Sequence, residues 1–164
     1  IVLSIFLGNL AMKTVTTPLL NKYGFKLVMM VNGVMIIVTF LLSACINENM
    51  QIGLIVVILF CGGLTRSLQF TSINTLSLAD IPKEKISSAS SVSGTAMQLS
   101  MALGIAIGSL TLTLVSLMHS GNIETPSVSD FRLALVLIAI FPIIGMIILH
   151  KLDSNAGISI RKLN

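Results

Sequence analysis

Charged residues are scarce in this chain. Aspartate, glutamate, lysine and arginine make up only 10% of the 164 residues, whereas 54% are hydrophobic and the mean hydropathy is +0.99. An ordinary soluble domain carries about 25% charged residues. A chain of this length cannot hide so much apolar surface in a water-soluble core. The composition therefore excludes a soluble globular domain and indicates that lipid is the solvent for much of the chain.

Other residue types are equally sparse. Tryptophan is absent and aromatic residues amount to 5%, so no strong aromatic belt marks the membrane interface. In an antiparallel hairpin the only two cysteines, Cys45 and Cys61, would differ in depth by roughly 9–12 Å, beyond the roughly 7 Å Cα limit for a disulfide, and we expect both to be free. The chain begins Ile1-Val2-Leu3, without a methionine or a charged leader, and we expect a fragment whose first helix is cut.

Apolar runs dominate what is present. A transmembrane helix needs about 20 apolar residues, so four runs are long enough to span and the first is too short. We predict an all-α protein with one membrane domain over 1–164, built as a polytopic transmembrane helix bundle. The expected spans are about 1–12 (truncated), 27–46, 52–78, 88–118 and 131–149, followed by a cytoplasmic tail over 150–164.

The net charge of +4 does not indicate nucleic acid, because the basic residues lie in short connections between apolar runs. Only lysine and arginine decide orientation. We therefore expect the first and third connections and the tail on the cytoplasmic side, and the second and fourth connections outside. The cytoplasmic side holds Lys13, Lys22, Lys26, Lys83, Lys85, Lys151, Arg161 and Lys162, and the outer connections hold Glu48, Glu124 and Asp130.

Two residues mark the fifth run. Asp130 precedes it and is an N-cap candidate. Pro142 lies inside it and is expected to kink the helix, because proline has no N–H to bond the carbonyl of Ile138.

The fourth run carries small residues at four-residue spacing, namely Ser100, Gly104 and Gly108. This spacing lets two helix backbones approach closely, which indicates tight packing in a bundle or, alternatively, a surface on which helices slide. On the same helix, Gln98 needs a polar partner in the membrane. It either bridges to another helix or faces a water-filled cavity.

Arg66 is the most unusual residue, because it lies within the third run, about 22 Å along the helix. A buried charge there costs at least ~2.5–3.5 kcal/mol. The side chain either extends to the inner headgroups or faces a polar cavity. Gln69, Phe70 and Ile73 share its helical face, with Asn74 at the edge, and this clustering favours the cavity.

The sequence contains no evident catalytic set. No Asp or Glu lies within a complete predicted span, and His119 and His150 are far apart at membrane borders. There is no serine–histidine–acid set, no histidine pair at metal spacing and no glycine-rich phosphate loop. We therefore expect no enzyme activity, no metal and no cofactor.

The stretch "RSLQFTSINTLSLADIPKEKISSASSVSGTAMQLSMALGIAIGS", from Arg66 to Ser109, resembles the C-terminal half of a major facilitator superfamily transporter. It is most similar to the drug:proton antiporter branch with fourteen spans, the multidrug efflux type. In that branch a long helix, a short Asp-Ile-Pro loop and a Ser-rich, Gly-rich helix follow one another. The matching residues are Arg66, Gln69, Phe70, Asn74, Asp80, Pro82, Gln98, Leu99, Ser100 and Gly104.

The first connection, "PLLNKYGFK", is similar to the superfamily's cytoplasmic loop motif Gly-x-x-x-Asp-Arg-x-Gly-Arg. Asn21, Lys22, Gly24 and Lys26 fill its acid, base, glycine and base positions. The chain departs from the motif at Thr17, where the leading glycine would be, and at Asn21, where the acid would be. Without the acid, a short basic turn is the alternative to a gating role.

The resemblance implies export of small amphipathic substrates in exchange for protons, by alternating access across the cell (inner or plasma) membrane. It also implies two partners besides the bilayer and the substrate: protons, and the missing N-terminal half of the same transporter, which holds most coupling carboxylates. Arg66, Gln69, Phe70, Asn74 and Gln98 would line the cavity. The alternatives are a non-transporting assembly or scaffold subunit that associates through Gly104 and Gly108, and an intramembrane enzyme.

Overall fold

The computed structural model describes residues 2–47, 49–119, 121, 125–153 and 156–158. The described residues form helices and no strand, which confirms the predicted all-α bundle. Four stretches are long and apolar enough to cross a membrane: Phe25–Ala44, Ile52–Ser77, Lys83–His119 and Val128–His150. The elements are α1 (Val2–Tyr23), α2 (Phe25–Ala44), α3 (Ile52–Ser77), the short 3-10 helix η1 (Lys83–Lys85), α4 (Ile86–His119), α5 (Val128–Ile138) and α6 (Ile140–His150).

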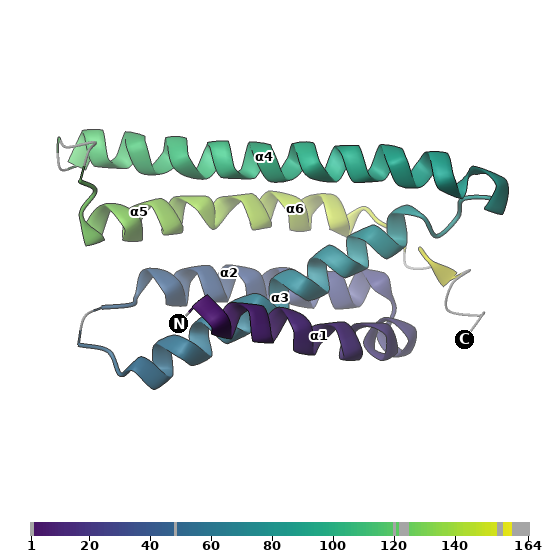
Figure 1. Ribbon diagram of the computed structural model, residues 1–164, viewed down its shortest axis with the longest axis horizontal. Helices are drawn as coiled ribbons and strands as arrows, with labels where there is room; N and C mark the ends of the chain where they lie inside the picture. The colour runs from purple at the N-terminus through teal and green to yellow at the C-terminus, as the bar shows by residue number, and fades with distance from the viewer. Residues whose placement is uncertain (1, 48, 120, 122–124, 154–155, 159–164) are drawn as a thin grey trace.

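The helices run up and down along one long axis (Figure 1). α1 and α3 pack on each other, α2 packs on α3, and the α5–α6 arm lies between α2 and α4. The α1–α2 turn, the α3–α4 connection and the C-terminal end of α6 lie at one end of the bundle, and the other two connections lie at the opposite end. The basic connections are therefore gathered at one end, which is the alternation expected from their charges.

The closest helix contact joins α1 to α3 through two glycines. A Cβ added to Gly63 would meet the carbonyl of Ile5, and one added to Gly8 would meet the carbonyl of Phe60. The hydroxyl of Ser67 donates to the carbonyl of Asn9 across the same contact, at 2.9 Å. Small residues thus permit backbone-to-backbone packing here, where lipid supplies no hydrophobic drive between helices.

The first helix is longer than the sequence indicated. The predicted segment ends at Met12, whereas α1 continues to Tyr23 and includes Pro18. The polar residues after Met12 suggested a loop, but the hydroxyl of Thr16 donates to the carbonyl of Met12 at 2.8 Å, and Leu20 joins the buried core. Local bonding and packing therefore carry the helix through a stretch that looks like a connection.

The predicted cytoplasmic loop motif is a tight turn between two helices. Asn21 and Lys22 belong to the last turn of α1, and Lys26 belongs to the first turn of α2. Only Gly24 separates the helices, at φ 83°, a conformation that glycine adopts without steric cost. The buried ring of Phe25 follows immediately and anchors the start of α2 in the core.

The start of α5 corrects the predicted cap. Ser127, not Asp130, is the N-cap: its hydroxyl accepts from the N–H of Asp130 at 3.3 Å, and the Asp130 carboxylate accepts from the N–H of Ser127 at 2.8 Å. This reciprocal capping box satisfies two donors that either residue alone would leave open. At the far end α5 stops at Ile138 and α6 begins at Ile140, which confirms an interruption at the carbonyl that Pro142 cannot bond.

Candidate functional site

A buried amide joins α2 to α3 near the middle of the bundle. Asn32 is 2% exposed, and its Nδ2 donates to the carbonyl of Thr65 at 2.8 Å and to Oε1 of Gln69 at 2.9 Å. An amide in an apolar helix needs such partners, because lipid offers none. The helical face of Arg66 predicted Gln69 as a site residue, but Asn32 was not predicted. The available signal for Asn32 was a lone asparagine inside the apolar stretch "VMMVNGVMIIV".

Arg66 lies one turn from Gln69 along α3 and borders a hollow of about 420 Å³. Its guanidinium lies 5.4 Å from the ring centroid of Phe40 on α2, within the range of a cation–π contact. A second arginine, Arg132 of α5, borders the same hollow. The remaining lining residues are Ser43, Ile46, Leu59, Val128, Phe131 and Leu135. We call this space the arginine hollow.

Arg132 is held by a helix end. Its Nη2 donates to the carbonyl of Ile46, just beyond the C-terminus of α2, at 3.0 Å. A cation there complements the unsatisfied carbonyls and the partial negative charge of the helix terminus. Its Nε is buried without a hydrogen-bond partner among the described residues. Nothing in the local sequence around Arg132 predicts this contact, because Ile46 is 86 residues away along the chain.

A second hollow, of about 540 Å³, lies among α2, α3 and α6. Gln69 and Ile73 of α3 line it, with Gly33 and Ile36 of α2 opposite the α6 residues Pro142 and Met146. We call it the glutamine hollow. Arg66 therefore borders the arginine hollow, whereas Gln69 and Ile73 border the glutamine hollow. A single cavity lined by this helical face stays a prediction.

The other predicted cavity residues lie elsewhere. Phe70 and Asn74 are exposed on α3 and line neither hollow, and Gln98 is exposed on α4. Arg66 is exposed as well, but it borders the arginine hollow, and Gln69 borders the glutamine hollow. The predicted role of Phe70, Asn74 and Gln98 as cavity residues stays a prediction.

The small-residue face of α4 is also bare in this chain. Ser100 and Gly104 are exposed, and a Cβ on Gly104 would meet nothing within 4 Å. A Cβ on Gly108 would lie 4.0 Å from the Ile138 side chain, which is ordinary contact. Close packing through these residues has no partner in the described part of the chain. The packing role of Ser100, Gly104 and Gly108 stays a prediction, and the tight glycine contact in the described chain joins α1 to α3.

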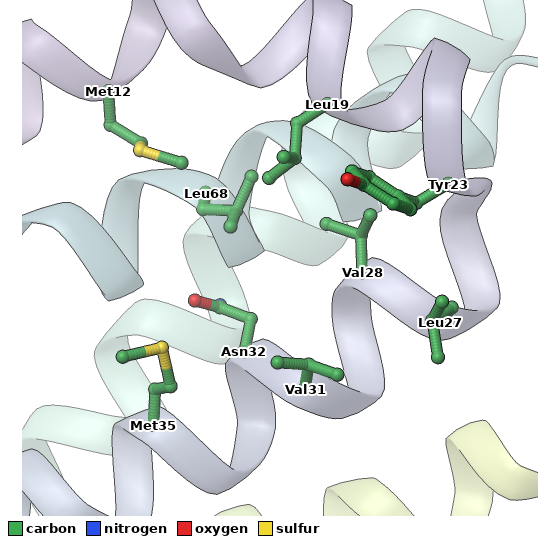
Figure 2. Close-up of a pocket in the computed structure, with 9 residues that line it drawn as sticks. All are labelled: Met12, Leu19, Tyr23, Leu27, Val28, Val31, Asn32, Met35 and Leu68. Atoms are coloured by element: carbon green, nitrogen blue, oxygen red, sulfur yellow. The ribbon is translucent and has the colours of Figure 1, made fainter.

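A third pocket, of about 390 Å³, opens on the other side of Asn32 between α1 and α2 (Figure 2). Its walls are almost entirely apolar, and Figure 2 shows the Asn32 amide pointing across towards α3. Two flexible methionines contribute to the lining, which is typical of adaptable surfaces. The lining residues are Met12, Leu19, Tyr23, Leu27, Val28, Val31, Asn32, Met35 and Leu68. Asn32 lines this pocket, and its hydrogen-bond partner Gln69 lines the glutamine hollow.

One pair at the opposite end was not anticipated. Nδ1 of His119, at the end of α4, lies 2.9 Å from Oδ1 of Asp130, whose side chain is fully buried. The sequence placed both residues at a membrane border without pairing them. Only the fold of the α4–α5 connection brings them together.

Comparison with known proteins fits this architecture. The sequence profile of the Major Facilitator Superfamily matches residues 1–159, nearly the whole chain. The chain belongs to the major facilitator superfamily. This agrees with the resemblance carried by the stretch from Arg66 to Ser109.

The relatives include the candidate multidrug resistance protein MdtD from several bacteria. Over 83% of its length, this chain is 30% identical to the Pectobacterium carotovorum protein. Over 95% of its length, it is 29% identical to the Citrobacter koseri protein. The Escherichia coli K12 protein is 28% identical over 95% of the chain. The chain spans 30–34% of the length of these relatives. No solved structure matches it significantly.

Proposed function

We propose that this chain forms the C-terminal part of a secondary active transporter that exports small amphipathic molecules in exchange for protons. The observation that carries the proposal is the pair of hollows along α3, where Arg66 and Gln69 project polar groups between apolar walls. Ligand pockets commonly combine apolar walls with a few placed polar groups. Membership of a transporter superfamily and the names of the relatives support export over a scaffold subunit or an enzyme.

In this proposal the transport path is completed by protein outside the chain. Phe70, Asn74 and Gln98 are exposed here, and they would line the cavity once the N-terminal half lies opposite. The bare face of Ser100, Gly104 and Gly108 would pack on that half and move against it during alternating access. The coupling carboxylates would come mostly from the same half.

The proposed orientation follows the positive-inside rule. The turn with Lys22 and Lys26, the connection with Lys83 and Lys85, and the C-terminus would face the cytoplasm. The transporter would then reside in the cell membrane, the inner membrane where a cell has two. The cytoplasmic turn at Gly24 would hold the ends of α1 and α2 at a fixed angle.

Efflux by the full-length protein tests the proposal. Cells that lack other exporters would be loaded with cationic, neutral and anionic amphipathic dyes, and energised efflux would be followed by fluorescence. We expect Arg66→Ala to lower the efflux of at least one dye about tenfold, because it removes the cation of the arginine hollow. Lys85→Ala, an exposed charge outside both hollows, serves as the matched control. Unchanged transport and unchanged proton coupling in Arg66→Ala would reject the role of Arg66, and no efflux by the wild-type protein would reject the function.

A further inference from the structure

Two cations from different helices border one small space. Arg66 comes from α3 and Arg132 from α5, and among the residues that the structure describes no aspartate or glutamate lines the arginine hollow. Of the described acids, Asp80 and Asp153 lie outside the helices, Glu84 lies in the short helix η1, and Asp130 is engaged by the N–H of Ser127 and by His119. Arg66 is exposed and Arg132 is half-buried. Two like charges that border one apolar-walled space repel each other, and an anion that enters the space would relieve this repulsion.

The two guanidinium groups keep donors available. Arg66 makes no hydrogen bond within the described chain, and the Phe40 ring accounts only for a cation–π contact. Arg132 uses one Nη2 donor on the carbonyl of Ile46, and its Nε has no partner. An arginine presents five N–H donors, so most of the donors in this space are free to receive a planar acid.

The walls decide what kind of anion fits. Phe40 and Phe131 contribute rings, and Leu59, Val128 and Leu135 contribute aliphatic side chains. The Ser43 hydroxyl already donates to the carbonyl of Thr39 at 2.7 Å. A volume of about 420 Å³ lies within the range of small-molecule sites. A hydrated inorganic ion would make no apolar contacts with these side chains. A molecule with an apolar part and a single acidic group would match both the apolar walls and the two positive charges.

We propose that the arginine hollow binds the acidic group of an amphipathic organic anion, such as an aromatic carboxylate or sulfonate. The proposal rests on the proposed export function and specifies a substrate class for it. Arg66 and Arg132 hold the acid, and the rings of Phe40 and Phe131 contact the apolar body. The phosphate of an anionic lipid has the same chemistry, so the test distinguishes the two sources.

A matched pair of probes isolates the charge. Full-length protein in phosphatidylcholine nanodiscs would be titrated with dansylglycine, a carboxylate, and with its neutral amide, and binding would be read by dansyl fluorescence. We expect the acid to bind at least tenfold more tightly than the amide. Arg66→Gln should weaken acid binding about tenfold and amide binding less than twofold, as expected when one charge-assisted contact is lost.

Further variants separate the site from general charge and from folding. Arg66→Lys keeps the charge and should retain part of the preference for the acid. Lys85→Gln removes a charge outside the hollow and should leave the preference intact. Arg132→Gln should also lower the preference, and Arg132→Lys controls for loss of the Ile46 contact. Equal binding of acid and amide by the wild-type protein, or an equal loss of both in Arg66→Gln, would overturn the proposal.

The lipid source is tested by repeating the titration in phosphatidylglycerol nanodiscs. A preserved preference for the acid supports an organic-anion site. A preference that disappears with the anionic lipid assigns the hollow to a headgroup and overturns the proposal. Failure of this site is distinguishable from failure of the proposed function: equal binding of the two probes with intact dye efflux removes only the anion site, whereas absent wild-type efflux removes the transporter.

Discussion

The α1–α3 contact and the face of α4 use the same kind of residue with opposite results. Gly8 and Gly63 bring two helix backbones together, whereas Gly104 faces open space. In α2 a third of the membrane-length window is buried, but in α4 only 11% is buried, and Ser116 is its one buried described residue. Small residues therefore permit close packing without showing which partner is present. The chain supplies the partner for α1 and leaves that of α4 to lipid or to other protein.

Filling the tight contact should have the largest effect. Gly63→Leu places a side chain against the backbone of Ile5, which cannot move aside as a flexible side chain can. We expect a loss of about 3 kcal/mol or more, enough to abolish accumulation of folded protein. Gly62→Leu is the matched control, because a Cβ there meets nothing within 4 Å. Thermal denaturation of the detergent-purified proteins checks this, and similar melting of the two variants would contradict the contact.

Removing the capping box should have the next largest effect. Asp130→Ala leaves the N–H of Ser127 without its acceptor at the start of α5, and it removes the contact with His119 that joins α5 to α4. We expect about 2 kcal/mol of destabilisation, the upper range for a helix cap. Asp130→Asn keeps an acceptor oxygen and should recover part of the loss. Equal stability of the alanine variant and the wild type in chemical denaturation would show that the pair is dispensable.

The buried amide link should contribute less. Asn32→Ala removes two hydrogen bonds and Gln69→Ala removes one of them. Interhelical hydrogen bonds in membranes average about 0.6 kcal/mol, so we expect about 1 kcal/mol for the first variant and about half of that for the second. The double variant measures their coupling. Fully additive losses would mean that the two amides do not act on each other.

The smallest effect on stability is expected on the bare face. Gly104→Leu meets no described neighbour, so it should change the stability of this bundle by less than about 0.5 kcal/mol. If the face packs against the other half, the same variant should lower dye efflux by the full-length protein several-fold. Ile105→Leu, a swap of similar volume at a side chain that is 74% exposed, is the control. Normal efflux in Gly104→Leu would reject a packing or sliding role for this face.

The sequence predicted the elements that the bilayer itself imposes. Long apolar runs must be helical to satisfy their backbone groups, so the spans and the interruption before Pro142 could be read without the fold. The continuation of α1 beyond Met12 could not, because it depends on the burial of Thr16 and Leu20 against other helices. Likewise the contacts of Arg132 with Ile46 and of His119 with Asp130 depend on where remote helix ends meet.

The candidate site was predicted in part for a geometric reason. At 3.6 residues per turn, Gln69 and Ile73 lie within about 60° of Arg66 in one direction, and Phe70 and Asn74 lie about 40–80° away in the other. The helical wheel therefore groups all five. The hollows take only the first flank, because α2 and the α5–α6 arm lie on that side of α3. Helical periodicity groups residues on one face, but it does not show which side of that face other helices cover.

The central claim is that the Arg66–Gln69–Ile73 face borders a water-filled path for substrate. The most direct measurement is the reaction of Ile73→Cys with thiol reagents in full-length protein from which Cys45 and Cys61 have been removed. The account predicts that a charged, water-soluble thiosulfonate modifies this cysteine and that a transported substrate slows the reaction at least several-fold. Modification only by a lipophilic maleimide, with no protection by substrate, would place this face against lipid and contradict the account.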